Sequence, residues 1–463
     1  MRPLTIKEIV RCVRAIDYPS MQRDETIDSV AFDSREIPTG GLFVPLKGER
    51  DGHEFVTDAI HHGAKATFWA NDPNDAPRDI IVIQVDDTLQ ALQDLAHYYL
   101  NLIQPKVVGI TGSAGKTTTK DMTAAALSAT FHVYKTQGNY NNEIGLPMTI
   151  LTMPEDTKVL VLEMGMSDFG EIDTLSRLAT PDVAVITMIG ESHIEYLVSR
   201  ANIAKAKLEI LNGLKENGTF IYPGDEPLLS EQLGEDLPFT AIRVGLDEGE
   251  DVYAMSINIT PEKTTFYTSM APEVEMAIPV AGLHNVRNAL VACAVAYTLG
   301  LSMEIIKEAL AGFHLSANRM EWVAGMDHSS ILNDTYNANP SAMKSVITTF
   351  TQMPESDMHS RRILVLGDML ELGDYSEELH ASVSETIDAE SISQVYLLGT
   401  EIVALRDALL KKNFPAEHIH YYSSDKDQLI TDLKEDLHPD DQILVKASHG
   451  MGLIDVVNAL RLQ

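Results

Sequence analysis

Cysteine is nearly absent from this 463-residue chain, which has only Cys12 and Cys293, far apart in sequence. Two isolated thiols cannot form a disulfide scaffold or a structural zinc site, and they fit a reducing compartment. Long apolar runs are also missing, and none approaches the ~20 residues that cross a bilayer. Residues 1–18 mix charged and apolar side chains and do not resemble a signal peptide. We therefore expect a cytoplasmic protein without membrane insertion.

Basic residues are scarce as well. The chain has 35 Lys and Arg against 68 Asp and Glu, which gives a formal charge of −33. Such a surface repels phosphate backbones and anionic lipid, so we expect no nucleic-acid partner. An anionic ligand would need a local positive site built against this field. Apolar residues make up 44% of the chain, and the length fits several domains of roughly 150 residues each.

The pattern of apolar residues changes character twice and predicts an α/β fold with three domains. Residues 1–104 form a small mixed α/β unit, and Pro105 breaks the helix that ends it. Residues 105–315 alternate apolar runs with amphipathic stretches, as in a parallel sheet covered by helices. Residues 316–463 repeat that alternation and predict a Rossmann-like α/β domain, without the G-x-G-x-x-G sequence of dinucleotide sites.

Within these domains, particular stretches predict particular elements. We expect helices at 53–62, 89–102, 288–299 and 304–311. The expected strands of the first two domains lie at 30–32, 41–45, 79–85, 107–111, 159–165, 183–190, 219–224, 251–259 and 264–268, the last two as an antiparallel extension. Four more strands are expected in SSILNDTYNANP, RRILVLGDML, QVYLLGT and DQILVKAS.

The strongest chemical signal is the run VVGITGSAGKTTTKDMTAAAL, at residues 107–127. An apolar strand enters a glycine-rich turn that leads into an alanine-rich helix, so backbone N–H groups and the helix dipole can hold phosphate oxygens. Ile110 replaces the first glycine of the general G-x-x-x-x-G-K-[ST] pattern. We predict a nucleoside triphosphate site, and a chance GKT in an ordinary turn is the alternative. Its residues are Gly112, Ser113, Ala114, Gly115, Lys116, Thr117 and Thr118.

Two polar side chains follow the next apolar runs. Glu163 ends VLVLEMG, and His193 follows VAVITMIGES. The carboxyl ends of parallel strands share one edge of a sheet, where open α/β proteins bind ligands. A carboxylate there suits a hard cation, so we predict a metal site, with a loop acid and a structural histidine as the alternatives. The helical run NIAKAKLEIL brings Lys205 and Lys207 close behind in sequence, and by pattern alone it is a solvated helix face.

Together, several motifs resemble the Mur ligase superfamily over the whole chain. They are TGSAGKTTTK, TQGNYNNEIGLPMT, EMGMSDFGEI, IGESHIEYL, AKAKLEI, GLHNVRNAL, NRMEW and DTYNANPSAM. Within the superfamily, NNEIGLP, DTYNANP and DSREIPTGGLFVPLKGERDGHEFV are most similar to the member that adds a dipeptide. The resemblance implies an ATP-dependent amide ligase that joins D-alanyl-D-alanine to UDP-N-acetylmuramoyl-tripeptide through an acyl phosphate. It also implies a monomer.

The resemblance assigns roles to residues of this chain. The nucleotide would be bound by the phosphate loop, with Asn288, Arg319 and Asp334. Thr117 and Glu163 would hold one Mg²⁺, and His193 would help to hold a second metal near the acyl phosphate. Lys207 would be a carbamylated lysine beside the metal site, with Lys205 as its competitor. Asn142, or its neighbour Asn141, would lie near the transferred phosphate. The groups implied in catalysis are thus Lys116, Asn142, His193 and Lys207, and those implied in substrate binding are Ser34, Arg35, Tyr336 and Asn339.

Three departures from the family pattern stand out. Ala114 replaces a polar residue in the phosphate loop, Asp225 lacks a preceding asparagine, and KASHGMGL alters a turn at Ser448 and His449.

The sequence also leaves other functions open. A sister ligase would add a single amino acid or a glutamate tail to folate, a phosphate-loop kinase or ATPase would need no amine, and a scaffold would bind ATP without turnover.

Overall fold

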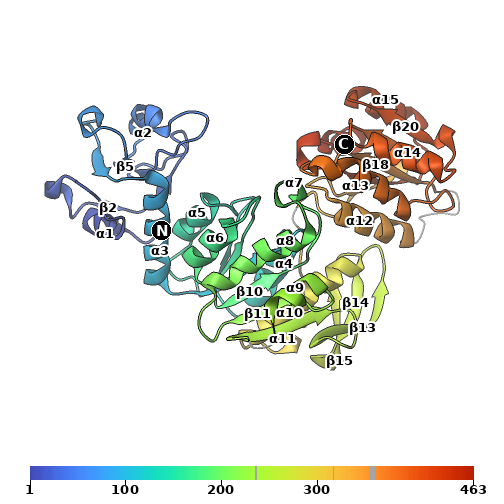
Figure 1. Ribbon diagram of the computed structural model, residues 1–463, viewed down its shortest axis with the longest axis horizontal. Helices are drawn as coiled ribbons and strands as arrows, with labels where there is room; N and C mark the ends of the chain where they lie inside the picture. The colour runs from blue at the N-terminus through green and yellow to red at the C-terminus, as the bar shows by residue number, and fades with distance from the viewer. Residues whose placement is uncertain (235–236, 316, 354–359, 463) are drawn as a thin grey trace.

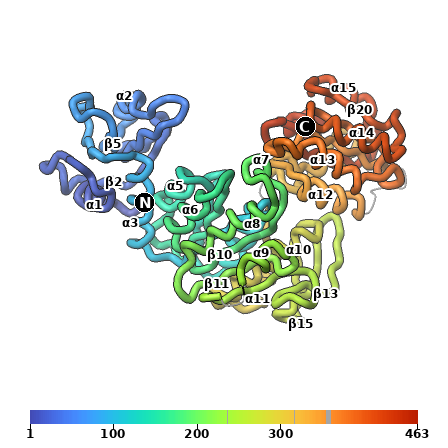
Figure 2. Tube along the Cα trace, viewed as in Figure 1, coloured from blue at the N-terminus to red at the C-terminus, as the bar shows by residue number. Residues whose placement is uncertain are grey.

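The computed structural model describes residues 1–234, 237–315, 317–353 and 360–462. The chain forms an N-terminal, a central and a C-terminal α/β lobe in sequence order, and the two outer lobes stand on either side of the central one (Figure 1). The Cα trace in Figure 2 shows the same arrangement. Each sheet draws its strands from a single stretch of chain. Within the described residues, the predicted α/β class with three domains is confirmed.

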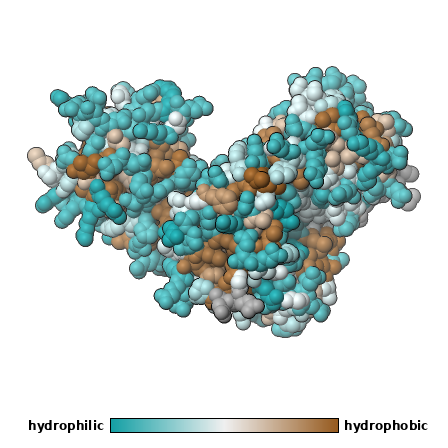
Figure 3. Space-filling view, viewed as in Figure 1, coloured by the Kyte–Doolittle hydropathy of each residue, from teal (hydrophilic) through white to brown (hydrophobic). Residues whose placement is uncertain are grey.

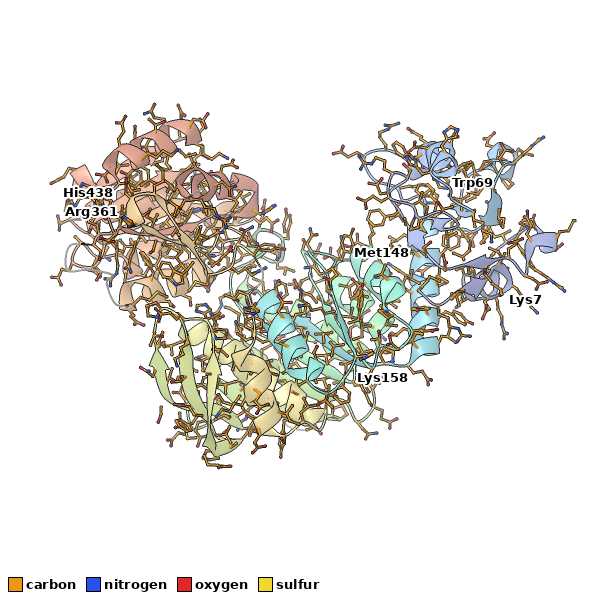
Figure 4. All side chains as sticks on the ribbon, turned by 180° about the vertical axis from the view of Figure 1, so that it is seen from behind. Lys7, Trp69, Met148, Lys158, Arg361 and His438 are labelled. Atoms are coloured by element: carbon orange, nitrogen blue, oxygen red, sulfur yellow. The ribbon has the colours of Figure 1, made fainter. Side chains whose placement is uncertain are left out.

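The N-terminal lobe is built on a small parallel sheet with strand order β3-β4-β5-β6. The predicted elements are found there, but β5 and the short β1–β2 pair were not predicted, because such short strands carry no clear alternation. Helix α3 ends at Ile103, with Gln104 as its C-cap just before Pro105 as expected, and packs against α5 of the central lobe, where Met148 lies (Figure 4). The elements are β1 (Leu4–Thr5), α1 (Ile6–Cys12), β2 (Thr26–Ile27), β3 (Val30–Ala31), β4 (Leu42–Phe43), α2 (Val56–His61), β5 (Ala66–Trp69), β6 (Ile81–Gln84) and α3 (Thr88–Ile103).

The central lobe has a large sheet with strand order β15-β14-β13-β12-β11-β10-β7-β9-β8. Strands β7 to β13 pair in parallel. Strands β13 and β14 form the predicted antiparallel extension, and β15, which was not predicted, adds a third strand to it. Helix α10 begins at residue 283, earlier than the predicted 288. The elements are β7 (Lys106–Thr111), α4 (Lys116–Ser128), β8 (Val133–Lys135), α5 (Gly145–Thr152), β9 (Val159–Glu163), α6 (Glu171–Ala179), β10 (Val183–Ile186), α7 (Ile194–Leu197), α8 (Arg200–Leu208), β11 (Thr219–Pro223), α9 (Pro227–Leu233), β12 (Thr240–Gly245), β13 (Val252–Ile259), β14 (Thr264–Thr268), β15 (Ala271–Ile278), α10 (Leu283–Thr298) and α11 (Met303–Ala311).

The C-terminal lobe repeats the open α/β design, with strand order β16-β17-β21-β18-β19-β20. The predicted runs form β17, β18, β19 and β21, whereas the edge strands β16 and β20 were not predicted. Arg361 and the backbone of His438 both bond Asp441 at one end of this sheet (Figure 4). The elements are β16 (Glu321–Ala324), β17 (Ser330–Asn333), α12 (Pro340–Gln352), β18 (Arg362–Gly367), α13 (Ser376–Ser382), β19 (Gln394–Leu398), α14 (Val403–Lys411), β20 (Ile419–Tyr422), α15 (Lys426–Asp436), β21 (Gln442–Lys446) and α16 (Ile454–Leu460).

The topology places the carboxyl ends of β9, β7 and β10 next to one another at one edge of the central sheet. The phosphate loop and the loops that carry Glu163 and His193 leave the sheet there. Among the helices of the described residues, none is long and apolar enough to cross a membrane.

Candidate active site

A cleft of about 630 Å³ lies between the central and C-terminal lobes. Its central wall comes from the phosphate loop, the loops after β9 and β10, and the start of α10; its other wall comes from β17, α12 and the chain that leads into them. The cleft is therefore formed jointly by two lobes.

On the surface, a separate wide notch lies between the N-terminal and C-terminal lobes, above the central lobe (Figure 3).

Glycine is required at two points of the phosphate loop. Gly112 and Gly115 have φ values of +151° and +80°, and α4 begins directly after Gly115. A Cβ at Gly112 would lie 1.8 Å from Thr187 Oγ1, and one at Gly115 would lie 2.7 Å from Asn288 Oδ1. The backbone thus passes close to its neighbours and leaves its N–H groups and the α4 N-terminus open to an anion. Lys116 Nζ donates a 2.8 Å hydrogen bond to the carbonyl of Gly112.

Four side chains meet at the end of this loop. Thr117 Oγ1 donates to Glu163 Oε2 at 2.9 Å, and Arg319 Nη2 of the C-terminal lobe donates to the same Thr117 oxygen at 2.9 Å. Asn141 Nδ2 donates to the other Glu163 oxygen, also at 2.9 Å. Glu163 is 4% exposed and its backbone N–H bonds Thr136 Oγ1. The cleft therefore holds a buried carboxylate beside a hydroxyl, with a cation from each wall nearby.

Burial strongly affects the two lysines of this region. The pKa of Lys116 is lowered by burial, an effect that Glu163 opposes and Arg319 reinforces. Lys207 is 1% exposed, and burial together with the charge of Lys116 puts its pKa well below the usual value. Lys205 is exposed on the same helix, with Nζ 5.9 Å from the ring centre of Phe169. Of the two candidate lysines, Lys207 is the one that faces the interior.

His193 lines the same cleft as Glu163 but contacts a different acid. Its Nδ1 lies 2.6 Å from Glu371 Oε2 of the C-terminal lobe, and this contact is the main cause of the lowered pKa of Glu371. Within the described residues, no group of three or more His, Cys, Asp or Glu side chains is arranged to hold a metal ion. The predicted metal site at Glu163 and His193 stays a prediction.

Two predicted asparagines have their side chains engaged in the protein itself. Asn142 Oδ1 accepts from the N–H of Gly145, the first residue of α5, at 2.8 Å, so Asn141 is the neighbour that reaches Glu163. Asn288 Oδ1 accepts from Thr119 Oγ1 at 3.1 Å, directly behind the phosphate loop. Both Asn142 and Asn288 also line the cleft.

The predicted residues of the C-terminal lobe gather on the opposite wall. The Arg319 guanidinium stacks 3.9 Å from the ring centre of Tyr336. Asp334 accepts from Lys446 Nζ at 2.5 Å and from the N–H of Met320 at 3.1 Å. Asn339 reaches across to the central lobe, where its Nδ2 donates to Ser192 Oγ at 2.7 Å and to the Ser113 carbonyl at 3.3 Å.

Two cleft residues, Lys446 and His284, were not predicted, and neither was Glu191, which bonds the cleft residue Ser341. Lys446 ends the apolar strand of DQILVKAS, and Glu191 follows the β10 run, so the strand-end rule that selected Glu163 could have found both. Glu191 Oε2 accepts from Ser341 Oγ of the C-terminal lobe at 2.6 Å. His284 carried no such signal; burial lowers its pKa to about 4.

Ser34 and Arg35 lie in the N-terminal lobe and are not part of the cleft lining. Ser34 is buried, and its hydroxyl donates to Asp58 Oδ2 at 2.6 Å. The Arg35 side chain is 79% exposed and pairs with Asp33 at 2.6 Å. Of the two, Arg35 is open to a ligand.

The fold and the cleft define a three-domain α/β protein with a phosphate loop at the contact between two domains. Residues 26–100 match the Mur ligase family catalytic domain, residues 110–296 the Mur ligase middle domain, and residues 318–449 the Mur ligase glutamate ligase domain. The chain belongs to the Mur ligase family.

Relatives and solved structures agree with this assignment over nearly the full length. The chain is 43% identical to the UDP-N-acetylmuramoyl-tripeptide–D-alanyl-D-alanine ligase of Bacillus subtilis, over 98% of each chain. It is 35% identical to the Escherichia coli enzyme of the same name, over 95% of this chain and 94% of that one. Among structures, MurF from Acinetobacter baumannii matches with a TM-score of 0.89 and 28% identity, over 99% of this chain and 98% of that one. MurF from Thermotoga maritima in complex with ADP matches with a TM-score of 0.81 and 28% identity, over 93% of this chain and 96% of that one.

Proposed function

We propose that this protein is an ATP-dependent amide ligase of peptidoglycan precursor synthesis. It joins D-alanyl-D-alanine to UDP-N-acetylmuramoyl-tripeptide and forms the UDP-linked pentapeptide, ADP and phosphate. The observation that carries the proposal is the cleft in which Arg319 of one lobe reaches Thr117 in the phosphate loop of another. The reaction named for the B. subtilis and E. coli relatives supplies the substrates.

The chemistry proceeds in two steps. The terminal carboxylate of the tripeptide takes the γ-phosphoryl group of ATP and becomes an acyl phosphate, with ADP leaving. The amine of the dipeptide then attacks the acyl carbon, and the tetrahedral intermediate releases phosphate and forms the amide. Lys116 and Arg319 place positive charge where the transferred phosphoryl group carries negative charge. No protein nucleophile is needed, because positioning and charge neutralisation are sufficient.

Both lobes contribute to the nucleotide site, which favours a mechanism with domain closure. The phosphate loop and Asn288 come from the central lobe, while Arg319, Asp334, Tyr336 and Asn339 come from the C-terminal lobe. Docking of the two walls would exclude water, which otherwise hydrolyses an acyl phosphate.

The residues present fit a magnesium ion at the phosphate loop. Thr117 Oγ1 and the Glu163 carboxylate lie 2.9 Å apart, and both are hard oxygen donors of the kind Mg²⁺ prefers. They would hold the ion that accompanies ATP, and His193 would help to hold a second one. Bound there, the metal would supply neutralisation of phosphate charge.

We further propose that Lys207 is carbamylated. Its neutral amine would attack carbon dioxide, lose a proton and become a carbamate, which turns a buried cation into an anion. The burial of Lys207 supports this role, since a neutral amine is the reactive form. Lys207→Ala should lose turnover and Lys205→Ala, on the exposed face, should keep it. A Lys207→Ala enzyme with full turnover and no response to bicarbonate would contradict the role.

For the N-terminal lobe we propose binding of the UDP group. Arg35 has a planar fork of donors that suits a diphosphate, and Ser34 would support the same loop. We propose in addition that the protein acts as a monomer in the cytoplasm.

The proposed function is tested by ADP release from Mg-ATP with UDP-N-acetylmuramoyl-tripeptide. Tripeptides ending in lysine and in diaminopimelate should both be supplied, with D-alanyl-D-alanine or single amino acids as acceptors. We expect release that depends on the dipeptide, together with the pentapeptide mass. Release with a single amino acid would instead make this a sister ligase, and release without any amine would make it an ATPase.

A further inference from the structure

The C-terminal lobe touches the central lobe at a second place, away from the phosphate loop. Helix α7 packs against the loop at 368–375, which ends in a short 3-10 helix, Gly373–Tyr375. Tyr375 Oη donates to the Val198 carbonyl at 2.8 Å, and the Glu195 N–H donates to the Glu371 carbonyl at 3.3 Å. We call this the α7 contact. It is the place where His193 meets Glu371.

The backbone on both sides of the α7 contact adopts a conformation that non-glycine residues rarely take. His193, Val198 and Glu371 have φ values of 63°, 68° and 62°. Such left-handed residues persist only where the surroundings enforce them, and they concentrate at functional sites. Two of them, His193 and Glu371, have their side chains in contact across the boundary between two lobes.

The loop that carries Glu371 is firmly held from behind. The N–H of Met369 donates to Nε2 of the fully buried His380 at 2.9 Å, and the N–H of Leu370 donates to Ser448 Oγ at 2.9 Å. Ser448 belongs to the turn in which this sequence departs from its family, so that turn supports the Glu371 loop. The position of Glu371 therefore follows the position of the C-terminal lobe as a whole.

We infer that Glu371 is a positioning residue for His193. Its carboxylate engages Nδ1 and leaves Nε2 as the ring nitrogen available to a cation in the cleft, the arrangement by which carboxylates commonly orient metal-binding histidines. In this structure Nδ1 lies 2.6 Å from the Glu371 carboxylate, and among the described residues it has no aligned hydrogen bond. The cation site at His193 is then complete only when the C-terminal lobe is docked on α7. This inference rests on the proposed function, because that function gives His193 its cation.

The test compares Glu371→Gln with Asp374→Asn, which removes the same charge from an exposed position on the same loop. Binding of Mn²⁺ is measured by the electron spin resonance of the free ion, with ADP present and no peptide substrate. Loss of such an orienting carboxylate typically weakens metal binding about 10- to 100-fold. We expect a weakening of about 10-fold for Glu371→Gln, no change for Asp374→Asn, and partial recovery for Glu371→Asp.

A second readout does not depend on any metal. This readout is the nuclear magnetic resonance spectrum of the free protein with ¹⁵N-labelled histidine, in which the His193 ring signals are assigned by their loss in His193→Gln. We expect these signals to shift in Glu371→Gln and to stay in place in Asp374→Asn. Unchanged Mn²⁺ binding or unchanged ring signals in Glu371→Gln would overturn the inference. If instead the wild type binds Mn²⁺ but forms no ADP with any substrate, the proposed function fails while the metal measurement still decides the role of Glu371.

Discussion

The two walls of the cleft are built in different ways. In the central wall, the phosphate-binding part is one continuous segment, in which the phosphate loop supplies its own glycines, lysine and helix N-terminus. The loops after β9 and β10 and the start of α10 complete this wall. The C-terminal wall is assembled from separate pieces: Arg319 precedes β16, Asp334 follows β17, and Lys446 ends β21. The phosphate-binding part of the first wall is encoded locally, and the second wall exists only because the sheet order brings β17 and β21 together.

This difference predicts different consequences of mutation. A change in the central wall removes a group that contacts phosphate directly, so it should affect chemistry and leave folding intact. A change in the C-terminal wall also disturbs the contacts between lobes, such as Asn339 with Ser192. It should therefore change both the rate of ADP formation and the docking of the two lobes on each other.

The largest effect is expected for Lys116→Ala. Removing the cation that faces the phosphates should lower the rate of ADP formation about 10³-fold, the scale found for single phosphate-stabilising cations. Burial disfavours the charge of Lys116, so the melting temperature should not fall. Lys120 is a matched control, since it is buried on the same helix but donates to the Thr136 carbonyl. Lys120→Ala should lower the melting temperature while retaining far more activity; equal rate losses would contradict the comparison.

Arg319→Ala tests the opposite wall, with an expected loss of about 10²-fold in kcat. The guanidinium contributes charge to the phosphate site and also joins the lobes through Thr117. Arg406 is the control, because it stacks on Tyr421 at 4.8 Å in the same lobe, outside the cleft lining. Arg406→Ala should behave like the wild type in steady-state assays. A loss confined to the KM for ATP would mean that Arg319 only binds the nucleotide.

The same contrast explains what the sequence could predict. Gly112, Lys116 and Thr117 lie in one motif whose geometry follows from local rules, so the residue pattern alone predicts the loop between β7 and α4. Glu163 could be predicted because it ends an apolar strand. The proximity of Thr117 to Glu163 then follows from the pairing of β7 with β9.

Other features required the folded chain. Asn141 and Asn142 are adjacent, and only the fold shows that Asn142 bonds the first residue of α5 while Asn141 reaches Glu163. The contact of His193 with Glu371 joins residues far apart in sequence and depends on how two lobes dock. Strand β5 was not predicted because its four buried residues show no alternation. Docking and packing of this kind produce no periodic pattern in a sequence.

A smaller effect is expected from pH, through a buried histidine on each side of the cleft. The pKa of His284 in the central wall is about 4, and burial also lowers the pKa of His380 behind the C-terminal wall. An unfolded histidine binds its proton near pH 6.5, so below that pH the unfolded state binds more protons and stability falls. We expect the melting temperature to drop by several degrees between pH 7 and pH 5. His284→Gln and His380→Gln should each flatten this dependence; unchanged slopes in both would rule these groups out.

The smallest effect should come from Ser448→Ala, which tests whether the divergent turn supports the C-terminal wall. The change leaves the N–H of Leu370 without its partner, a loss of about 1 kcal/mol. For a chain of this size that is a drop of roughly 2 °C in melting temperature. Ser382→Ala is the control, because Ser382 bonds a carbonyl within its own helix. If the turn holds the Glu371 loop, Ser448→Ala should lower kcat severalfold and Ser382→Ala should not. Equal kcat values in the two variants would mean that the C-terminal wall keeps its shape without this turn.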